Sequence, residues 1–362
     1  MKNKIVMTLA TLAFASVATA GDDGFKITGD LATSVFTESG KGDNNAFPGT
    51  GGAIGAGENN GDFSVDMMEV QLEKAVGNSG FVVGIGYGRL FDGINNTIDP
   101  VTGAPRATLN LTNAYFHHKV GDTGLSFKLG KFAANLGAES YNYMNNMNYT
   151  RSYGFQLLNP FFFTGLAADY TINDMISVGA VVANSDSNSD IDENESKHMG
   201  VNATIKPMEA LTIKLNYLAG KAGVNDNVDY VETTRINASA TYTWTMYDFG
   251  LAYNSLSTED AATTSVLTDM TATSIALYAG AKMEMWGAGL RYEMFDDGDG
   301  MFTVVDNAHD TITLTGWYNV DQNAVLKLEI ASTSADKQVF IDDAGAADDA
   351  MMAYGLGFMY RF

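Results

Sequence analysis

Residues suited to catalysis are few in this sequence. It contains no Cys and only four His, which excludes thiol nucleophiles, disulfides and thiolate metal sites. His117 and His118 are adjacent in a segment with strand-like alternation, so their side chains point to opposite faces and do not share a ligand sphere. His309 lies near Asp306 and Asp310, but nothing marks a serine partner for it. We therefore predict no catalytic residue, no metal site and no cofactor.

The charged residues instead follow the period of a β-strand. In 288–294, Leu290 and Tyr292 alternate with Arg291 and Glu293, so one face is apolar and the other polar. Fixed charges on such a face need contact with water. The ionisable residues predicted to lie on the polar faces of the strands are Lys26, Asp30, Glu69, Glu73, Lys128, Lys214, Lys282, Arg291, Glu293, Lys327 and Glu329.

The N-terminus predicts export. A basic start is followed by an apolar stretch over 5–17 and by Ala18-Thr19-Ala20, which fits a cleavage site, so 1–20 is expected to be a cleaved signal peptide. After it, no apolar run reaches the roughly 18 residues of a transmembrane helix. The net charge of −22 argues against binding nucleic acid. An exported soluble β-protein and an outer-membrane β-barrel remain.

The connections between strands decide between these two classes. Seven predicted joints are tight turns and the others are long and polar, and this short–long alternation is typical of an outer-membrane barrel with periplasmic turns and extracellular loops. In lipid every backbone polar group must be paired, so the sheet has to close. We predict one all-β antiparallel transmembrane barrel over 21–362, with strands near 24–37, 63–76, 80–91, 106–120, 124–132, 161–172, 174–184, 198–206, 210–220, 231–245, 248–256, 271–283, 287–296, 311–319, 324–333 and 350–362.

Aromatic residues near the strand ends are expected to form girdles at the membrane surfaces. They are Tyr87, Phe91, Trp244, Phe249, Tyr292, Tyr318 and Tyr354.

Two motifs carry a resemblance to known proteins. The chain ends Tyr360-Arg361-Phe362, and a second stretch runs from Lys128-Leu129-Gly130-Lys131-Phe132 to Asn148-Tyr149-Thr150-Arg151-Ser152. Together they resemble Gram-negative outer-membrane porins, in particular the OmpL-like family of β-barrel porins. The resemblance implies recognition of Phe362 by the barrel-assembly machinery and a homotrimer. The chain lacks the ladder of arginines typical of strongly anion-selective porins.

A barrel of about sixteen strands leaves an aqueous lumen, so the ionisable residues on the polar faces of the strands are predicted to line a pore. In general porins the third long loop narrows that pore, and here the loop is 132–160. Its aromatic residues would be costly to leave bare in water. The expected constriction residues are Glu139, Tyr141, Tyr143, Asn145, Asn146 and Arg151.

The predicted function is passive diffusion of small hydrophilic solutes and ions across the outer membrane of a Gram-negative bacterium. Outer-membrane lipid and lipopolysaccharide are the expected surroundings. Acidic residues concentrated in the long loops predict a weak preference for cations at low salt, which screening reduces. Two alternatives stay open, namely a solute-specific channel and a non-conducting barrel that serves as a scaffold for a partner.

Overall fold

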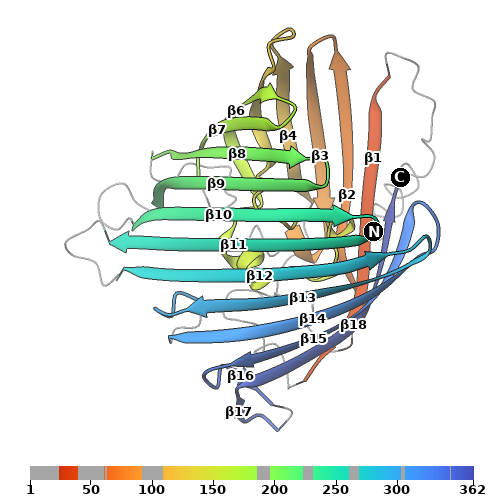
Figure 1. Cartoon of the computed structure of the whole chain (residues 1–362), viewed down its shortest axis with the longest axis vertical. Helices are drawn as coiled ribbons and strands as arrows, with labels where there is room; N and C mark the ends of the chain where they lie inside the picture. The colour runs from red at the N-terminus through yellow and green to blue at the C-terminus, as the bar shows by residue number, and fades with distance from the viewer. Residues whose placement is uncertain are drawn as a thin grey trace, which may run out of the picture.

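The chain forms a single closed barrel in a computed structural model (Figure 1). The structure describes residues 24–39, 61, 63–91, 109–185, 196–222, 231–260, 269–302, 306–342 and 344–362, so the expected signal peptide lies outside the described residues. The barrel strands are β1 (Lys26–Glu38), β2 (Phe63–Val76), β3 (Ser79–Tyr87), β4 (Asn110–Lys119), β5 (Leu125–Ala133), β6 (Phe162–Asn173), β7 (Ile176–Ala183), β8 (His198–Met208), β9 (Leu211–Ala222), β10 (Val231–Trp244), β11 (Tyr247–Asp260), β12 (Met270–Lys282), β13 (Trp286–Asp297), β14 (Asn307–Asn319), β15 (Ala324–Ala335) and β18 (Ala350–Arg361).

Neighbouring strands pair antiparallel around the whole barrel, and β1 closes it by pairing with β18. The closing register sets Asp30 opposite Arg361 and Val35 opposite Leu356. The predicted sixteen-stranded antiparallel barrel is therefore confirmed. The largest differences are at strand ends: β3 stops at Tyr87, β4 starts at Asn110, and β11 continues to Asp260.

Alternation along each strand separates an apolar outer surface from a polar interior. In β14, Ile312 and Leu314 are 52% and 54% exposed, whereas Thr313 and Thr315 are fully buried. Closure removes the strand edges, so the backbone groups are paired without water. The outer surface thus suits contact with lipid and the inner one suits polar groups.

The expected aromatic girdle needs one correction. Trp244 and Tyr354 are exposed on the outer surface, but Phe91 is 1% exposed. It follows the end of β3 and packs with Phe36 and Met67 in an interior cluster. The alternation along β3 did not predict the position of Phe91, because β3 ends at Tyr87, four residues before it.

Four short elements were not predicted from the sequence. The 3-10 helix η1 (Tyr143–Asn145) and the helix α3 (Tyr153–Leu158) lie between β5 and β6, and the strands β16 (Phe340–Ile341) and β17 (Ala347–Asp348) form a small hairpin after β15. In the described part of the chain, no helix has the length and apolar character needed to cross a membrane.

The outer surface gives a direct test of lipid contact. Leu277 is 46% exposed and stands opposite Leu251 on β11 and Tyr292 on β13. We expect Leu277→Lys to lower the free energy of unfolding in phospholipid vesicles by about 2–4 kcal/mol, the cost of a Lys at the bilayer midplane. Thr241→Lys adds the same charge to a residue that lines an interior cavity and should change the stability by less than about 1 kcal/mol. Equal losses in the two variants would contradict this orientation.

Candidate functional site: the barrel interior

The segment between β5 and β6, residues 134–161, lies inside the barrel and is called the inward segment below. It begins where Ala134 donates its backbone N–H to the Phe161 carbonyl at 2.9 Å. Asn142 caps η1 by accepting from the Met144 backbone N–H, and Ser152 caps α3 by accepting from that of Phe155. Such caps satisfy donors that a helix leaves open at its N-terminus. The segment therefore satisfies some of its backbone donors through its own side chains.

Two glutamates of the wall hold the backbone of the inward segment. Glu329 on β15 accepts from the backbone N–H groups of Tyr149 and Thr150 at 2.7 and 3.0 Å. Glu293 on β13 accepts from those of Tyr153 and Gly154 at 2.8 and 2.7 Å. Hydrogen bonds to a charged acceptor are roughly twice as strong as neutral ones. Both carboxylates are buried, so they act as anchors for the segment.

A buried ion pair strengthens the same side. Arg291 on β13 lies 2.9 Å from Glu139 of the inward segment, and the two side chains are 3% and 6% exposed. Arg291 also donates to the Thr150 carbonyl at 2.8 Å. Lys327 on β15 donates to the carbonyls of Asn146 and Asn148 at 2.7 and 3.3 Å. Cations of the wall thus bind carbonyls, while its carboxylates bind N–H groups.

Further along the same part of the wall, past β18, acidic residues of β1 and β2 bind side chains of the segment. Asp66 accepts from the Tyr149 hydroxyl, and Glu69 accepts from that of Tyr141 at 3.0 Å. Burial raises the pKa of Tyr149 well above its ordinary value, and the nearby Asp66 charge raises it further. The phenol therefore keeps its proton and acts as the donor. Asp30 on β1 accepts from the Asn142 amide at 2.9 Å.

The inward segment therefore crosses the lumen. Its hydrogen bonds with the wall reach β1, β2, β10, β11, β13, β14, β15 and β18. At the wall made by β5 to β9, it packs instead through Leu136, which clusters with Phe132, Phe163 and Leu218. The polar attachment is thus one-sided.

The predicted pore-lining residues divide into two groups. Glu69, Arg291, Glu293, Lys327 and Glu329 are 0–4% exposed and bind the inward segment, and Asp30 binds Asn142 and Arg361. The others are more open: Lys26 lies 3.8 Å from Glu73, Lys128 lies 3.9 Å from Asp169, Lys282 pairs with Asp248, and Lys214 is half-buried. Whether either group lines a conducting pore stays a prediction.

The predicted constriction residues are largely occupied with the segment's own structure. Tyr141, Tyr143, Asn146 and Arg151 are buried, and the Arg151 guanidinium donates to the Tyr141 carbonyl and the Tyr143 hydroxyl. Asn145 alone of the six is exposed. The phenols and amides that we expected to face solutes thus mainly position the segment.

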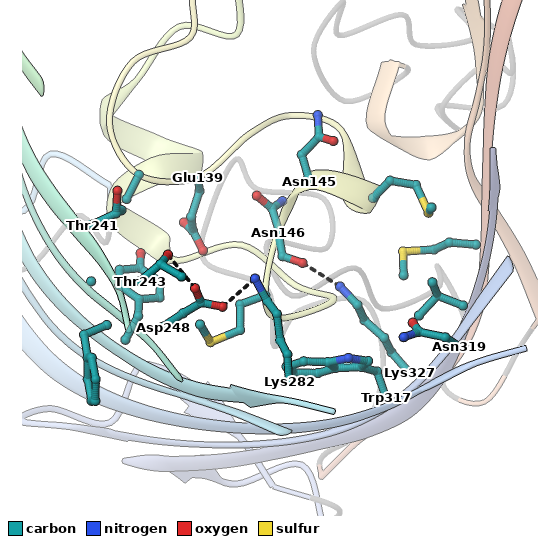
Figure 2. A pocket seen from close by; sticks show the side chains of 18 of the residues that line it. Glu139, Asn145, Asn146, Thr241, Thr243, Asp248, Lys282, Trp317, Asn319 and Lys327 are labelled. Carbon is teal, nitrogen blue, oxygen red and sulfur yellow. Dashed lines mark hydrogen bonds and ion pairs between the residues drawn. The ribbon is translucent and has the colours of Figure 1, made fainter. Parts of the chain in front are cut away.

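A cavity of about 520 Å³ lies beside the inward segment, near the short turns (Figure 2). Figure 2 shows Lys282 directed toward Asp248, and Lys327 directed toward Asn146 of the segment. Thr241, Thr243 and Asn319 add neutral polar groups to its lining. A cavity lined by paired charges and neutral polar groups is suited to small polar solutes.

An asparagine row on the wall was not predicted as a site. Cross-strand register aligns Asn202 on β8 with Asn216 on β9, then with Asn237 on β10 and Asn254 on β11. Asn159 of the inward segment donates to Asn254 at 3.1 Å and accepts from Asn237. Amides carry no charge to mark them in the sequence, and only the strand register shows that they lie in one row.

At the end of the barrel away from the short turns, aromatic residues cover part of the interior. Tyr153 of α3 contacts Phe295 and His309, with ring centroids 6.2 and 4.5 Å away. Phe302 and Phe340, from the connections after β13 and β15, join the same cluster. This cover lies over β13 to β15, on the side where the glutamates hold the inward segment.

Solved structures with the same architecture are outer-membrane proteins. OmpT of Vibrio cholerae matches with a TM-score of 0.62 and 13% identity, over 95% of this chain and 99% of that one. An anion-selective porin from Comamonas acidovorans matches with a TM-score of 0.63 and 13% identity, over 94% and 99%. The outer membrane channel DcaP of Acinetobacter baumannii gives 0.62 and 11% identity, over 94% and 97%. At these identities the likeness shows the fold alone.

The family of the chain is identified from its sequence. No curated protein matches the chain. A family model described as "Putative beta-barrel porin-2, OmpL-like" matches residues 24–362, which is the whole barrel. The chain therefore belongs to this OmpL-like family of outer-membrane β-barrel porins.

Proposed function

We propose that the protein is a porin through which small hydrophilic solutes and ions diffuse passively. The observation that carries this proposal is the one-sided attachment of the inward segment. Its polar contacts gather on β10, β11, β13 to β15, β18, β1 and β2, while two cavities of about 520 and 250 Å³ lie beside it. Selection then follows from the width and polarity of these spaces, and no covalent step is involved.

The proposal includes the membrane in which the protein lies, its oligomeric state and its ion preference. Family membership and the porin neighbours, one of them in a trimer form, support a homotrimer in the outer membrane of a Gram-negative bacterium. Cleavage of 1–20 and recognition of Phe362 by the assembly machinery rest on the sequence at the two ends of the chain. The described acidic residues near the long connections include Asp296, Asp299 and Asp310. Their charge supports a weak cation preference at low salt.

Single-channel recording tests the conducting function. Residues 21–362, purified in detergent and added to a planar lipid bilayer in 1 M KCl, should produce discrete and stable conductance steps. A potassium chloride gradient should then give a reversal potential that favours cations at low salt. A bilayer that stays silent, while the same preparation shows folded β-structure by circular dichroism, would contradict the porin function.

The second candidate is a non-conducting scaffold barrel. It is favoured by the extent of the inward segment, which binds eight strands, and by the aromatic cover formed by Tyr153, Phe295 and Phe340. Such an interior leaves less free space than an empty barrel of this size. The bilayer experiment decides between the two candidates, because a scaffold is silent.

A further inference from the structure

The second cavity, of about 250 Å³, lies between the start of the inward segment and the wall made by β5 to β9. Its polar lining includes Lys128, Asp169, Asn202, Lys214 and Asn216, which come from β5, β6, β8 and β9. Its apolar lining includes Phe132, Leu136, Phe163 and Leu218. The cavity is therefore polar along one part of its surface and apolar along another.

Strand register brings the polar groups together. Asp169 stands opposite Gly179, Gly179 opposite Asn202, and Asn202 opposite Asn216. A Cβ on Gly179 would lie 2.5 Å from the Asp169 Oδ1 and 2.6 Å from the Asn202 Nδ2. The missing side chain at Gly179 thus lets these two groups share the space above β7. Lys214 is in the next row, opposite Thr204.

The charges around this cavity leave one cation without a counter-ion. Lys128 lies 3.9 Å from Asp169, whereas Lys214 makes no ion pair with any residue that the structure describes. The buried Nδ2 of Asn216 likewise has no hydrogen-bond partner in the described part of the chain. Buried donors without acceptors cost free energy, so this site is short of one acceptor.

The acidic groups of the wall do not supply that acceptor. Asp66, Glu69, Glu293 and Glu329 are each 0–1% exposed, lie on β2, β13 and β15, and accept from hydroxyl or backbone N–H donors of the inward segment. The passage along β5 to β9 is therefore locally basic, although the whole chain is strongly acidic.

We infer that this cavity is a binding site for small organic carboxylates on their way through the barrel. Lys214 and the Asn216 amide bind the carboxylate oxygens, because charge-assisted hydrogen bonds suit that group. Phe163, Leu136 and Leu218 contact the short hydrocarbon part of the solute. The inference rests on the proposed porin function and adds the class of solute.

The site also predicts how ion preference changes with salt. Exposed acidic residues at the mouth are screened within about 8 Å at physiological ionic strength. The half-buried Lys214 is screened less, because partly buried charges are shielded from salt. The preference for cations at low salt should therefore change to a preference for anions as the salt concentration rises. In Lys214→Gln the mouth is screened in the same way, so the cation preference should fade without a preference for anions taking its place.

Butyrate serves as the probe in a bilayer experiment. Added to one side in potassium chloride, it should reduce the chloride current of the wild-type channel saturably. Lys214→Gln should raise the half-blocking concentration about tenfold, which corresponds to the loss of one charge-assisted hydrogen bond. Lys119→Gln is the matched control, since Lys119 is exposed at the end of β4 and lines neither cavity, and should change the value less than twofold.

The outcomes separate the site from the proposed function. Equal block of the wild type and Lys214→Gln in conducting channels overturns the carboxylate site and leaves the porin function intact. If no variant conducts, the porin function fails, and calorimetric titration of the folded barrel with butyrate tests the site alone. Weaker heat with Lys214→Gln than with Lys119→Gln then supports the site, and equal heats overturn it.

Discussion

Replacing Glu293 and Glu329 together by Ala is expected to raise the mean single-channel conductance and the noise of the open state. The two carboxylates accept hydrogen bonds from four backbone N–H groups of the inward segment. Without them these buried donors lose their partners, at a cost of about 1–3 kcal/mol each. The segment between Tyr149 and Gly154 should therefore leave the wall of β13 and β15, which widens the passage.

Limited trypsin cleavage gives an independent measure of the same release. Arg151 lies between the two anchored dipeptides and is 8% exposed, so trypsin should cut after it slowly in the wild type and at least tenfold faster in the double variant. Glu73→Ala is the matched control, because Glu73 is more open and its partner Lys26 is 3.8 Å away. Unchanged conductance together with unchanged cleavage would show that other contacts suffice to hold the segment.

The barrel was predictable because lipid and closure act on every strand in the same way. Period two, short turns and long polar connections repeat along the chain, so an error at one residue leaves the sheet intact. Phe91 shows the limit of this pattern. Parity says which face a strand residue takes, but it does not say where the strand ends, and Phe91 lies beyond the end of β3.

The interior was less predictable, because its contacts join residues far apart in the sequence. The alternation identified Glu293 and Glu329 as facing inward, and the aromatic content of 132–160 indicated a segment that avoids bulk water. No local sequence pattern indicates that Glu329 binds the backbone at Tyr149 and Thr150, some 180 residues earlier. Those contacts form only when the segment follows one path across the lumen, and the segment follows that path only because all the contacts hold it there.

Neutral interior residues were harder to predict than charged ones. The asparagine row from Asn202 to Asn254 carries no charge and has no motif spacing, yet its members lie opposite one another on adjacent strands. Register can be estimated only when strand ends are known within a residue. The same uncertainty hid the separation of Lys214, which has no counter-ion in the described part of the chain, from Lys128, which lies near Asp169.

The buried pair of Arg291 and Glu139 should give the largest loss of stability. Arg291→Met leaves the Glu139 carboxylate without its cation inside the barrel and also removes the donor to the Thr150 carbonyl. Breaking a buried ion pair by removing one partner costs about 3–5 kcal/mol. We expect a loss of this size in the free energy of unfolding, measured by urea titration in phospholipid vesicles.

A double-mutant cycle separates the ion pair from simple loss of packing. Glu139→Gln with Arg291→Met removes both charges, so the double variant should be more stable than Arg291→Met alone, since no uncompensated charge of the pair remains. Lys282→Met is the control, because the Lys282 side chain is 64% exposed and the pair of an exposed Lys contributes only about 0–1 kcal/mol. If Arg291→Met lost no more stability than Lys282→Met, the inward segment would be held by its carboxylate and amide contacts alone, and Arg291 would be free to serve the passage of solutes instead.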